Sequence, residues 1–242
     1  MANDFIFLHG GAQGSWVWSE TIEALKSQGQ DMAGAALALD VPGCGTKRSL
    51  ATDEMDPQQL LANLLADIDA ANLEDVILVG HSQAGTILPL LVKARPGRFR
   101  HVVYVSCLAP FGDQTALSWR SEMPGESALS SHAPGSPERF QAMFCNDMEG
   151  DAADHFLARL GHDSWPASSY GMSGWHYEHL ADMPSTYVLC LRDAALLPSW
   201  QQIFAQRVHA KVIVSIDAGH QVMNTRPHEL TKVLLAIARD SA

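Results

Sequence analysis

The sequence predicts an α/β fold in which helices flank a mostly parallel central sheet. Two apolar runs, 76–79 and 102–105, show no alternation of apolar and polar residues, so both faces of each strand should be buried. Segments with apolar residues at helical spacing, such as 18–26, lie between runs of this kind. The length of 242 residues suits one domain with room for an insertion.

The individual elements follow from the same patterns. Short apolar runs predict strands at about 5–8, 35–39, 76–79, 102–105, 186–191 and 211–216. Apolar residues at helical spacing predict helices at about 18–26, 86–93, 137–144, 152–160, 198–207 and 227–239. Asp56 and Pro57 are residue types that commonly cap and begin a helix, so we predict that a helix starts there. Pro89 falls inside the run 86–93, where it predicts a kink.

The regular alternation stops near residue 107 and resumes after residue 184. The intervening segment is rich in Gly, Pro, Ser, Met and aromatic residues. We interpret 107–184 as a helical cap inserted into a core formed by 1–106 and 185–242. Open α/β sheets bind ligands at the carboxyl ends of their strands, so the cap should cover that edge. Its large side chains predict a small, apolar or aromatic substrate, contacted by Trp119, Phe144, Trp165 and Trp175.

Composition excludes several classes of partner. The chain has 16 Lys and Arg against 27 Asp and Glu, a net charge of −11, which argues against nucleic acid as a ligand. The one basic cluster is interpreted as the end of a helix, where cations are favoured, and consists of Lys93, Arg95, Arg98 and Arg100. No apolar stretch is long enough for a membrane helix, and the acidic start at Asp4 is unlike a signal peptide. We therefore expect a cytoplasmic protein without a membrane partner. The sequence allows a homodimer but does not specify one.

Cysteine usage supports the same compartment. Four cysteines lie far apart and form no C-x-x-C pair: Cys44, Cys107, Cys145 and Cys190. Separate, reduced thiols are expected in a cytoplasmic protein.

The most specific motif lies where the strand 76–79 meets the helical run 86–93. The residues there are Gly80-His-Ser-Gln-Ala84, a G-x-S-x-A pattern followed by Gly85. A serine at such a sharp turn is held in a strained backbone conformation that raises its hydroxyl above the sheet. Its neighbours two positions away must be small because strand and helix nearly touch. The pattern predicts Ser82 as a nucleophile.

A serine nucleophile needs a base and an acid that orients the base. His220 follows the strand 211–216 and Asp193 follows the strand 186–191, so both lie at the same sheet edge as Ser82. Their order along the chain, serine then acid then histidine, is the one expected for this architecture. Four other residues compete less well for these roles: Asp113 and Asp217 as the acid, and His209 and His228 as the base. Of these, Asp113 is the strongest alternative.

Two further groups complete the predicted site. The backbone N–H of Gln83 and that of Gly11, in the loop after the first strand, should form an oxyanion hole. His9, beside that loop, is interpreted as a structural residue. The cluster of His176, Glu178 and His179 lacks a further ligand at matching spacing, so we predict no metal site and no cofactor.

Taken together, these motifs resemble the α/β-hydrolase superfamily. The resemblance is closest to the branch of plant methylesterases and hydroxynitrile lyases, with their small bacterial esterase relatives. It is carried by the residues 7–12, 39–45 and 76–85 and by Asp193 and His220. It implies the roles given above for Ser82, Asp193, His220, Gly11 and Gln83.

The resemblance does not extend to lyase chemistry. Hydroxynitrile lyases of this kind have a lysine directly after the histidine and a threonine at the position of Gly10, whereas this chain has Gln221 and Gly10. Without that cation, cyanide is not stabilised. We therefore predict a serine hydrolase that cleaves a carboxylic ester through an acyl-enzyme. The alternatives are a cofactor-free oxygenase or lyase and a non-catalytic ligand receptor of the same fold.

Overall fold

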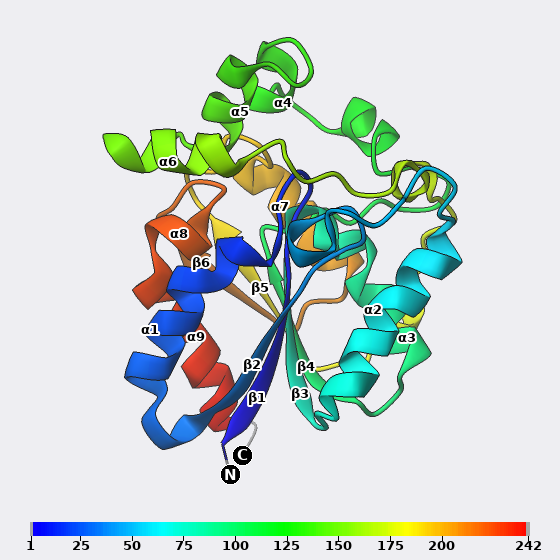
Figure 1. Ribbon diagram of the computed structural model, residues 1–242, viewed down its shortest axis with the longest axis vertical. Coiled ribbons are helices and arrows are strands. Elements are labelled where there is room, and N and C mark those ends of the chain that lie inside the picture. Colours follow the sequence, from blue (N-terminus) through cyan, green and yellow to red (C-terminus); the bar gives the residue numbers. More distant parts are fainter. Residues whose placement is uncertain (1, 241–242) are drawn as a thin grey trace.

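The structure, a computed structural model, describes residues 2–240 and is built around one six-stranded sheet (Figure 1). Neighbouring strands are all parallel and lie in the order β2-β1-β3-β4-β5-β6. The strands are β1 (Asn3–Leu8), β2 (Ala33–Leu39), β3 (Val76–His81), β4 (Phe99–Val105), β5 (Ser185–Cys190) and β6 (Val212–Ile216). The predicted α/β fold with a parallel central sheet is confirmed.

Helices cover both faces of this sheet (Figure 1). One face carries α1 (Ser19–Gly29), α8 (Val222–Thr225) and α9 (Pro227–Asp240). The other carries α2 (Pro57–Ala71), α3 (Leu88–Ala94) and α7 (Pro198–Arg207). The start of α2 matches the sequence prediction: Asp56 caps it, and its side chain accepts a hydrogen bond from the backbone N–H of Gln59 at 2.8 Å.

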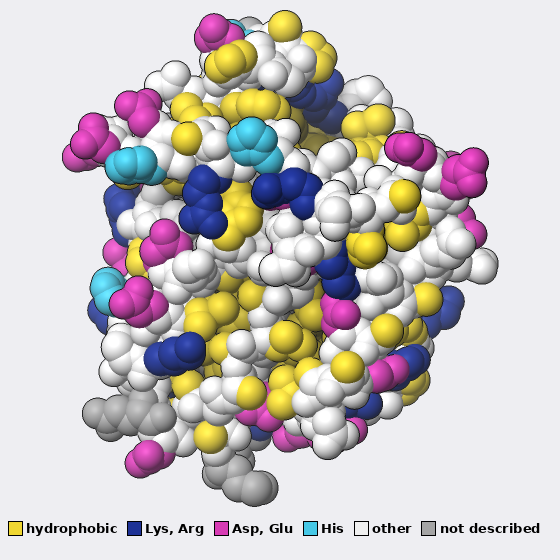
Figure 2. All heavy atoms as spheres, in the orientation of Figure 1, with side chains coloured by type: hydrophobic (Ala, Val, Ile, Leu, Met, Phe, Trp, Pro, Cys, Tyr) yellow, Lys and Arg dark blue, Asp and Glu magenta, His cyan; other side chains and the backbone are white. Residues whose placement is uncertain are grey.

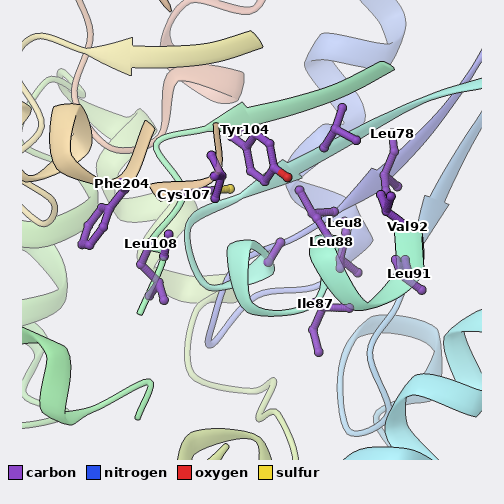
Figure 3. Close-up of a cluster of buried hydrophobic side chains, with 14 of the residues drawn as sticks. Leu8, Leu78, Ile87, Leu88, Leu91, Val92, Tyr104, Cys107, Leu108 and Phe204 are labelled. Carbon is purple, nitrogen blue, oxygen red and sulfur yellow. The ribbon is translucent and has the colours of Figure 1, made fainter. Parts of the chain in front are cut away.

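The strands divide their apolar side chains between the two layers. In β3, Val76 and Leu78 face one core cluster, and Ile77 and Val79 face the other. This explains why the run 76–79 shows no alternation, since both faces of the strand are buried. Figure 3 shows the first cluster, where side chains from α3 pack against those of the strands. Each fully buried side chain of this size stabilises the fold by about 1.5–3 kcal/mol.

The helical run predicted at 86–93 is divided into two helices. The 3₁₀ helix η4 (Ser82–Thr86) follows β3 directly, and α3 begins after Ile87. Pro89 therefore lies in the first turn of α3, where a backbone N–H has no partner within the helix. The predicted kink at Pro89 is wrong, because this proline begins a helix instead of interrupting one.

The segment between β4 and β5 lies above the carboxyl ends of the strands (Figure 1). It contains α4 (Ala128–Ser131), α5 (Pro137–Phe144) and α6 (Asp151–Arg159). Hydrogen bonds to the rest of the chain hold it in place: the Ser164 N–H donates to the carbonyl of Gly43 at 3.1 Å, and the Ala128 N–H donates to the carbonyl of Ala194 at 2.8 Å. Whether 107–184 acts as a cap remains a prediction.

The surface is mixed in character. Figure 2 shows charged side chains around the upper and outer parts of one face and an apolar patch in its lower middle, over the sheet edge formed by β2. All four cysteines are buried and free. Within residues 2–240, no helix combines the length and the apolar character that a membrane crossing requires.

Candidate active site

Ser82 lies on the sharp turn between β3 and η4. Its φ is +55°, a left-handed conformation that costs a residue other than glycine about 1 kcal/mol or more. The neighbouring positions are crowded: a Cβ on Gly80 would be 2.6 Å from Cδ1 of Leu88, and one on Gly85 would be 2.0 Å from the carbonyl oxygen of Leu108. The expected requirement for small residues is therefore met, and it extends to Gly85.

Three side chains from the ends of three strands meet beside this turn. Oγ of Ser82 lies 3.0 Å from Nε2 of His220, and Nδ1 of His220 lies 2.7 Å from Oδ2 of Asp193. These residues follow β3, β6 and β5 respectively. The histidine and aspartate side chains are only 1% and 0% exposed. With Nδ1–H donating to the carboxylate, Nε2 is left to accept the serine proton.

The carboxylate of Asp193 is held from several sides. Oδ1 accepts the backbone N–H groups of Ala195 and Leu196, each at 2.8 Å. Oδ2 accepts the hydroxyl of Ser106 at 2.5 Å in addition to the ring of His220. These hydrogen bonds to a charged acceptor fix the direction of the carboxylate. Sequence reasoning missed Ser106, although its place directly after β4 puts it at the same sheet edge.

His220 has its own supporting contacts. The ring of His81 lies 4.5 Å from that of His220, and its Nε2 donates to the carbonyl of His220 at 2.9 Å. Burial, and secondarily the charge of His220, lower the pKa of His81 well below its usual value, so His81 is a neutral donor. Sequence reasoning also missed this role, although His81 stands inside the serine motif.

The segment between β4 and β5 also contacts the loops that carry the acid and the base. Oδ2 of Asp147 accepts the N–H of Gly219, directly before His220, at 2.7 Å. Nδ2 of Asn146 donates to the carbonyl of Arg192, directly before Asp193, at 2.6 Å. Two adjacent residues therefore tie this segment to both loops. No sequence motif marks them.

The competing residues lie elsewhere. Asp113 is exposed, and Asp217 is 72% exposed and forms an ion pair with Arg192 at 2.8 Å. His209 and His228 are exposed as well. Among these candidates in the described residues, only His220 lies within hydrogen-bonding distance of Ser82, and only Asp193 lies within hydrogen-bonding distance of His220.

The two predicted oxyanion donors line the same cavity as Ser82. Gln83 is in the first turn of η4, where backbone N–H groups have no partner within the helix. Gly11 lines the same cavity as Ser82, and a Cβ there would be 2.3 Å from Oε1 of Gln83. A Cβ on Gly10 would be 2.9 Å from Cβ of Ser82. The loop after β1 therefore packs directly against the serine.

A cavity of about 300 Å³ opens beside Ser82. Most of its lining side chains are apolar, and they include Trp119 and Phe144 among the four predicted substrate contacts. Trp165 and Trp175 are not in this lining. Their indole N–H groups donate to backbone carbonyls, that of Gly10 at 3.1 Å and that of Gln114 at 2.8 Å. These hydrogen bonds tie both rings to the backbone, and the substrate contact expected of them stays a prediction.

Two further histidines are held by contacts with the backbone. His9 is fully buried between backbone groups: Nδ1 donates to the carbonyl of Gly10 at 2.8 Å and Nε2 accepts the N–H of Val41 at 3.2 Å. Nε2 of His179 lies 3.0 Å from the carbonyl oxygen of Pro89. In the described part of the chain, no three side chains form a cluster suited to a metal ion.

Comparison with known proteins places the chain in a family. A model of the alpha/beta hydrolase family matches residues 5–233. Polyneuridine aldehyde esterase of Rauvolfia serpentina is 26% identical, over 97% of this chain and 95% of that one. Carbendazim hydrolyzing esterase of Nocardioides sp. (strain SG-4G) is 29% identical, over 98% and 100%. The crystal structure of polyneuridine aldehyde esterase superimposes with a TM-score of 0.81 at 21% identity, over 98% and 100%. The protein belongs to the alpha/beta hydrolase family.

Proposed function

We propose that the protein is a serine hydrolase that cleaves a carboxylic ester of a small, largely apolar or aromatic molecule. The observation that carries this proposal is the unbroken hydrogen-bonded series from Ser82 through His220 to Asp193, with its hydroxyl end at the wall of an apolar cavity. The names of two full-length relatives, both called esterases, support the choice of an ester over other acyl compounds.

In the first half of the reaction, Ser82 attacks the ester carbonyl. His220 takes the serine proton through Nε2, and Asp193 stabilises the resulting imidazolium through Nδ1–H. Negative charge develops on the carbonyl oxygen, where the N–H groups of Gly11 and Gln83 stabilise it. Removal of one such donor typically costs about 3–4 kcal/mol of transition-state stabilisation. His220 then protonates the leaving alcohol, and the acyl group stays on Ser82.

In the second half, water replaces the alcohol. His220 removes a proton from this water, which attacks the acyl-enzyme, and the carboxylic acid leaves as Ser82 recovers its proton. The apolar walls contributed by Trp119 and Phe144 exclude bulk water and hold the organic part of the ester. Residues 107–184 act as the cap in this proposal. A cytoplasmic location is also part of it, and the proposed chemistry is compatible with a homodimer but does not require one.

The test is steady turnover of a p-nitrophenyl ester by the wild-type protein and by Ser82→Ala. We expect many turnovers per molecule in the wild type and their loss in the variant. Ser27→Ala is the matched control, because Ser27 is an exposed serine of α1 that donates to the carbonyl of Ala24 and is not among the residues that line the cavity. Turnover that survives in Ser82→Ala would contradict the proposal.

The alternatives differ in what they require of Ser82. A cofactor-free oxygenase would use the His220–Asp193 pair as a base without covalent bonding to the serine, and would not be inactivated by a fluorophosphonate. A ligand receptor would bind an ester without steady turnover. A lyase that stabilises cyanide lacks its cation here, since Gln221 follows the histidine. None of these is favoured by a specific contact in the site.

A further inference from the structure

The cavity beside Ser82 has a marked charge imbalance. Its lining, within the described chain, includes two arginines and neither Asp nor Glu. Arg120 comes from the 3₁₀ helix η5 (Ser118–Glu122), and Arg139 comes from the first turn of α5. The other lining residues of α5 are apolar: Phe140, Met143 and Phe144. Two cations therefore lie in a largely apolar wall.

Neither arginine has a carboxylate partner. None of the ion pairs formed among residues 2–240 involves Arg120 or Arg139. Arg120 donates through Nη1 to the carbonyl of Leu129 at 3.1 Å. Within the same residues, the guanidinium of Arg139 makes no hydrogen bond, although its backbone N–H is capped by Ser136. Both side chains are half-buried.

The positive charge of Arg120 also acts on the guanidinium of Arg139. Partial burial and, secondarily, the positive charge of Arg120 lower the pKa of Arg139. Like charges that share a site are unfavourable unless an anion lies between them. Among the described residues, six of the eleven arginines form no ion pair, whereas others do, as Arg95 does with Asp69 at 2.5 Å. What distinguishes Arg120 and Arg139 is that both line the cavity beside Ser82.

We infer that the ester preferred by this protein carries a second, anionic group, a carboxylate, which Arg139 and Arg120 bind while the ester carbonyl lies at Ser82. The inference rests on the proposed function and names its substrate class. Guanidinium groups suit this task because their planar array of N–H donors matches a carboxylate. The apolar side chains of α5 would hold the hydrocarbon that joins the two ends of the molecule.

The test compares matched charged and neutral esters. For the acyl side, p-nitrophenyl hydrogen adipate is compared with p-nitrophenyl hexanoate, which has a methyl group in place of the carboxylate. For the alcohol side, para-acetoxybenzoate is compared with para-acetoxybenzamide. We expect kcat/KM to be about tenfold higher or more for the charged member of at least one pair, as hydrogen bonds to charged groups allow.

A variant identifies the group responsible. Arg139→Gln should lower the charged-to-neutral ratio of kcat/KM about tenfold. Arg239→Gln makes the same change of charge at an exposed position of α9 and should leave the ratio unchanged. Raising the ionic strength should lower the same ratio in the wild-type protein, a readout that does not depend on any variant.

The outcomes separate this inference from the function on which it rests. Turnover of the neutral esters with a ratio near or below one in both pairs would overturn the anionic substrate and leave the esterase in place. An unchanged ratio in a folded Arg139→Gln protein would also overturn it. Absence of turnover with all four esters would overturn the proposed function and this inference together.

Discussion

The sheet edge and the segment 107–184 contribute to the site in different ways. In the proposed function the sheet edge supplies the reacting groups, which follow three parallel strands and are joined by hydrogen bonds. The inserted segment supplies most of the cavity wall, including Trp119, Phe144 and the two unpaired arginines. In the proposed function, one part therefore determines the reaction and the other determines which molecule enters the cavity. This division is typical of folds in which the loops vary from protein to protein while the scaffold is kept.

The division is not complete. Asn146 and Asp147 belong to the inserted segment, but they bond to the residues directly before Asp193 and His220. The wall of the cavity is thus mechanically joined to the acid and the base. A change in this segment can alter the chemical step as well as substrate choice.

The largest expected effect is on the sheet side. His220→Ala should lower kcat by about 10⁴-fold or more, because the serine then has no base. His209→Ala is the matched control, since His209 is exposed in the turn that follows α7. Steady-state kinetics with a p-nitrophenyl ester measure both. Equal activity in the two variants would remove His220 from the mechanism.

The contact between the two regions should have a smaller effect. In Asp147→Ala the N–H of Gly219 loses its acceptor, so we expect kcat to fall about tenfold while KM changes less. Asp154→Ala, an exposed acid of α6, serves as control. If Asp147→Ala only destabilised the fold, kcat of the folded fraction would be unchanged. That result would mean that Asp147 does not position His220.

Stability should distinguish the two regions as well. In Gly85→Ala the new Cβ would meet the backbone carbonyl of Leu108, which cannot move freely, and we expect a loss of about 1–3 kcal/mol in the free energy of unfolding. Gly171→Ala lies in the inserted segment, where a Cβ meets nothing within 4 Å, and should be neutral or slightly stabilising. Urea denaturation followed by circular dichroism compares them. Equal stability of the two variants would contradict the tight packing at the serine turn.

The smallest effect concerns a histidine of the sheet. Burial lowers the pKa of His101 in β4 to about 4, against about 6.5 in the unfolded chain. Between these values the unfolded chain binds a proton that the folded one does not, so the free energy of unfolding falls as the pH falls. His101→Gln should reduce the slope of the free energy of unfolding against pH by up to about 1 kcal/mol per pH unit. This figure is smaller than the full value for one proton because solvent reaches part of the ring.

The control for this measurement is a histidine of the inserted segment. His176 is exposed, and His176→Gln should leave the dependence of stability on pH unchanged. If both variants show the slope of the wild-type protein between pH 6.5 and about 4, the burial of His101 does not carry this effect.

The sheet and its reacting groups could be predicted from the sequence because they depend on local patterns. An apolar run without alternation marks a strand buried on both faces, and the small residues around Ser82 mark a crowded turn. Asp193 and His220 could be placed because parallel strands end at one edge. The helix predicted at 198–207 is found as α7 with the same bounds.

Other features depend on contacts distant in sequence and could not be predicted. Trp165 has the composition of a pocket residue, but its indole bonds to a carbonyl 155 positions away. Ser106 and Asp147 become supporting residues only when β4 and the inserted segment are placed beside Asp193 and His220. Pro89 was misjudged for a local reason, since the sequence does not mark the boundary between η4 and α3.

The most direct test of the central claim is a crystal structure of the protein after reaction with a fluorophosphonate. The account predicts a covalent bond from phosphorus to Oγ of Ser82, with the phosphonyl oxygen within hydrogen-bonding distance of the backbone N–H groups of Gly11 and Gln83. A bond to another residue, or an oxygen directed away from both N–H groups, would contradict it.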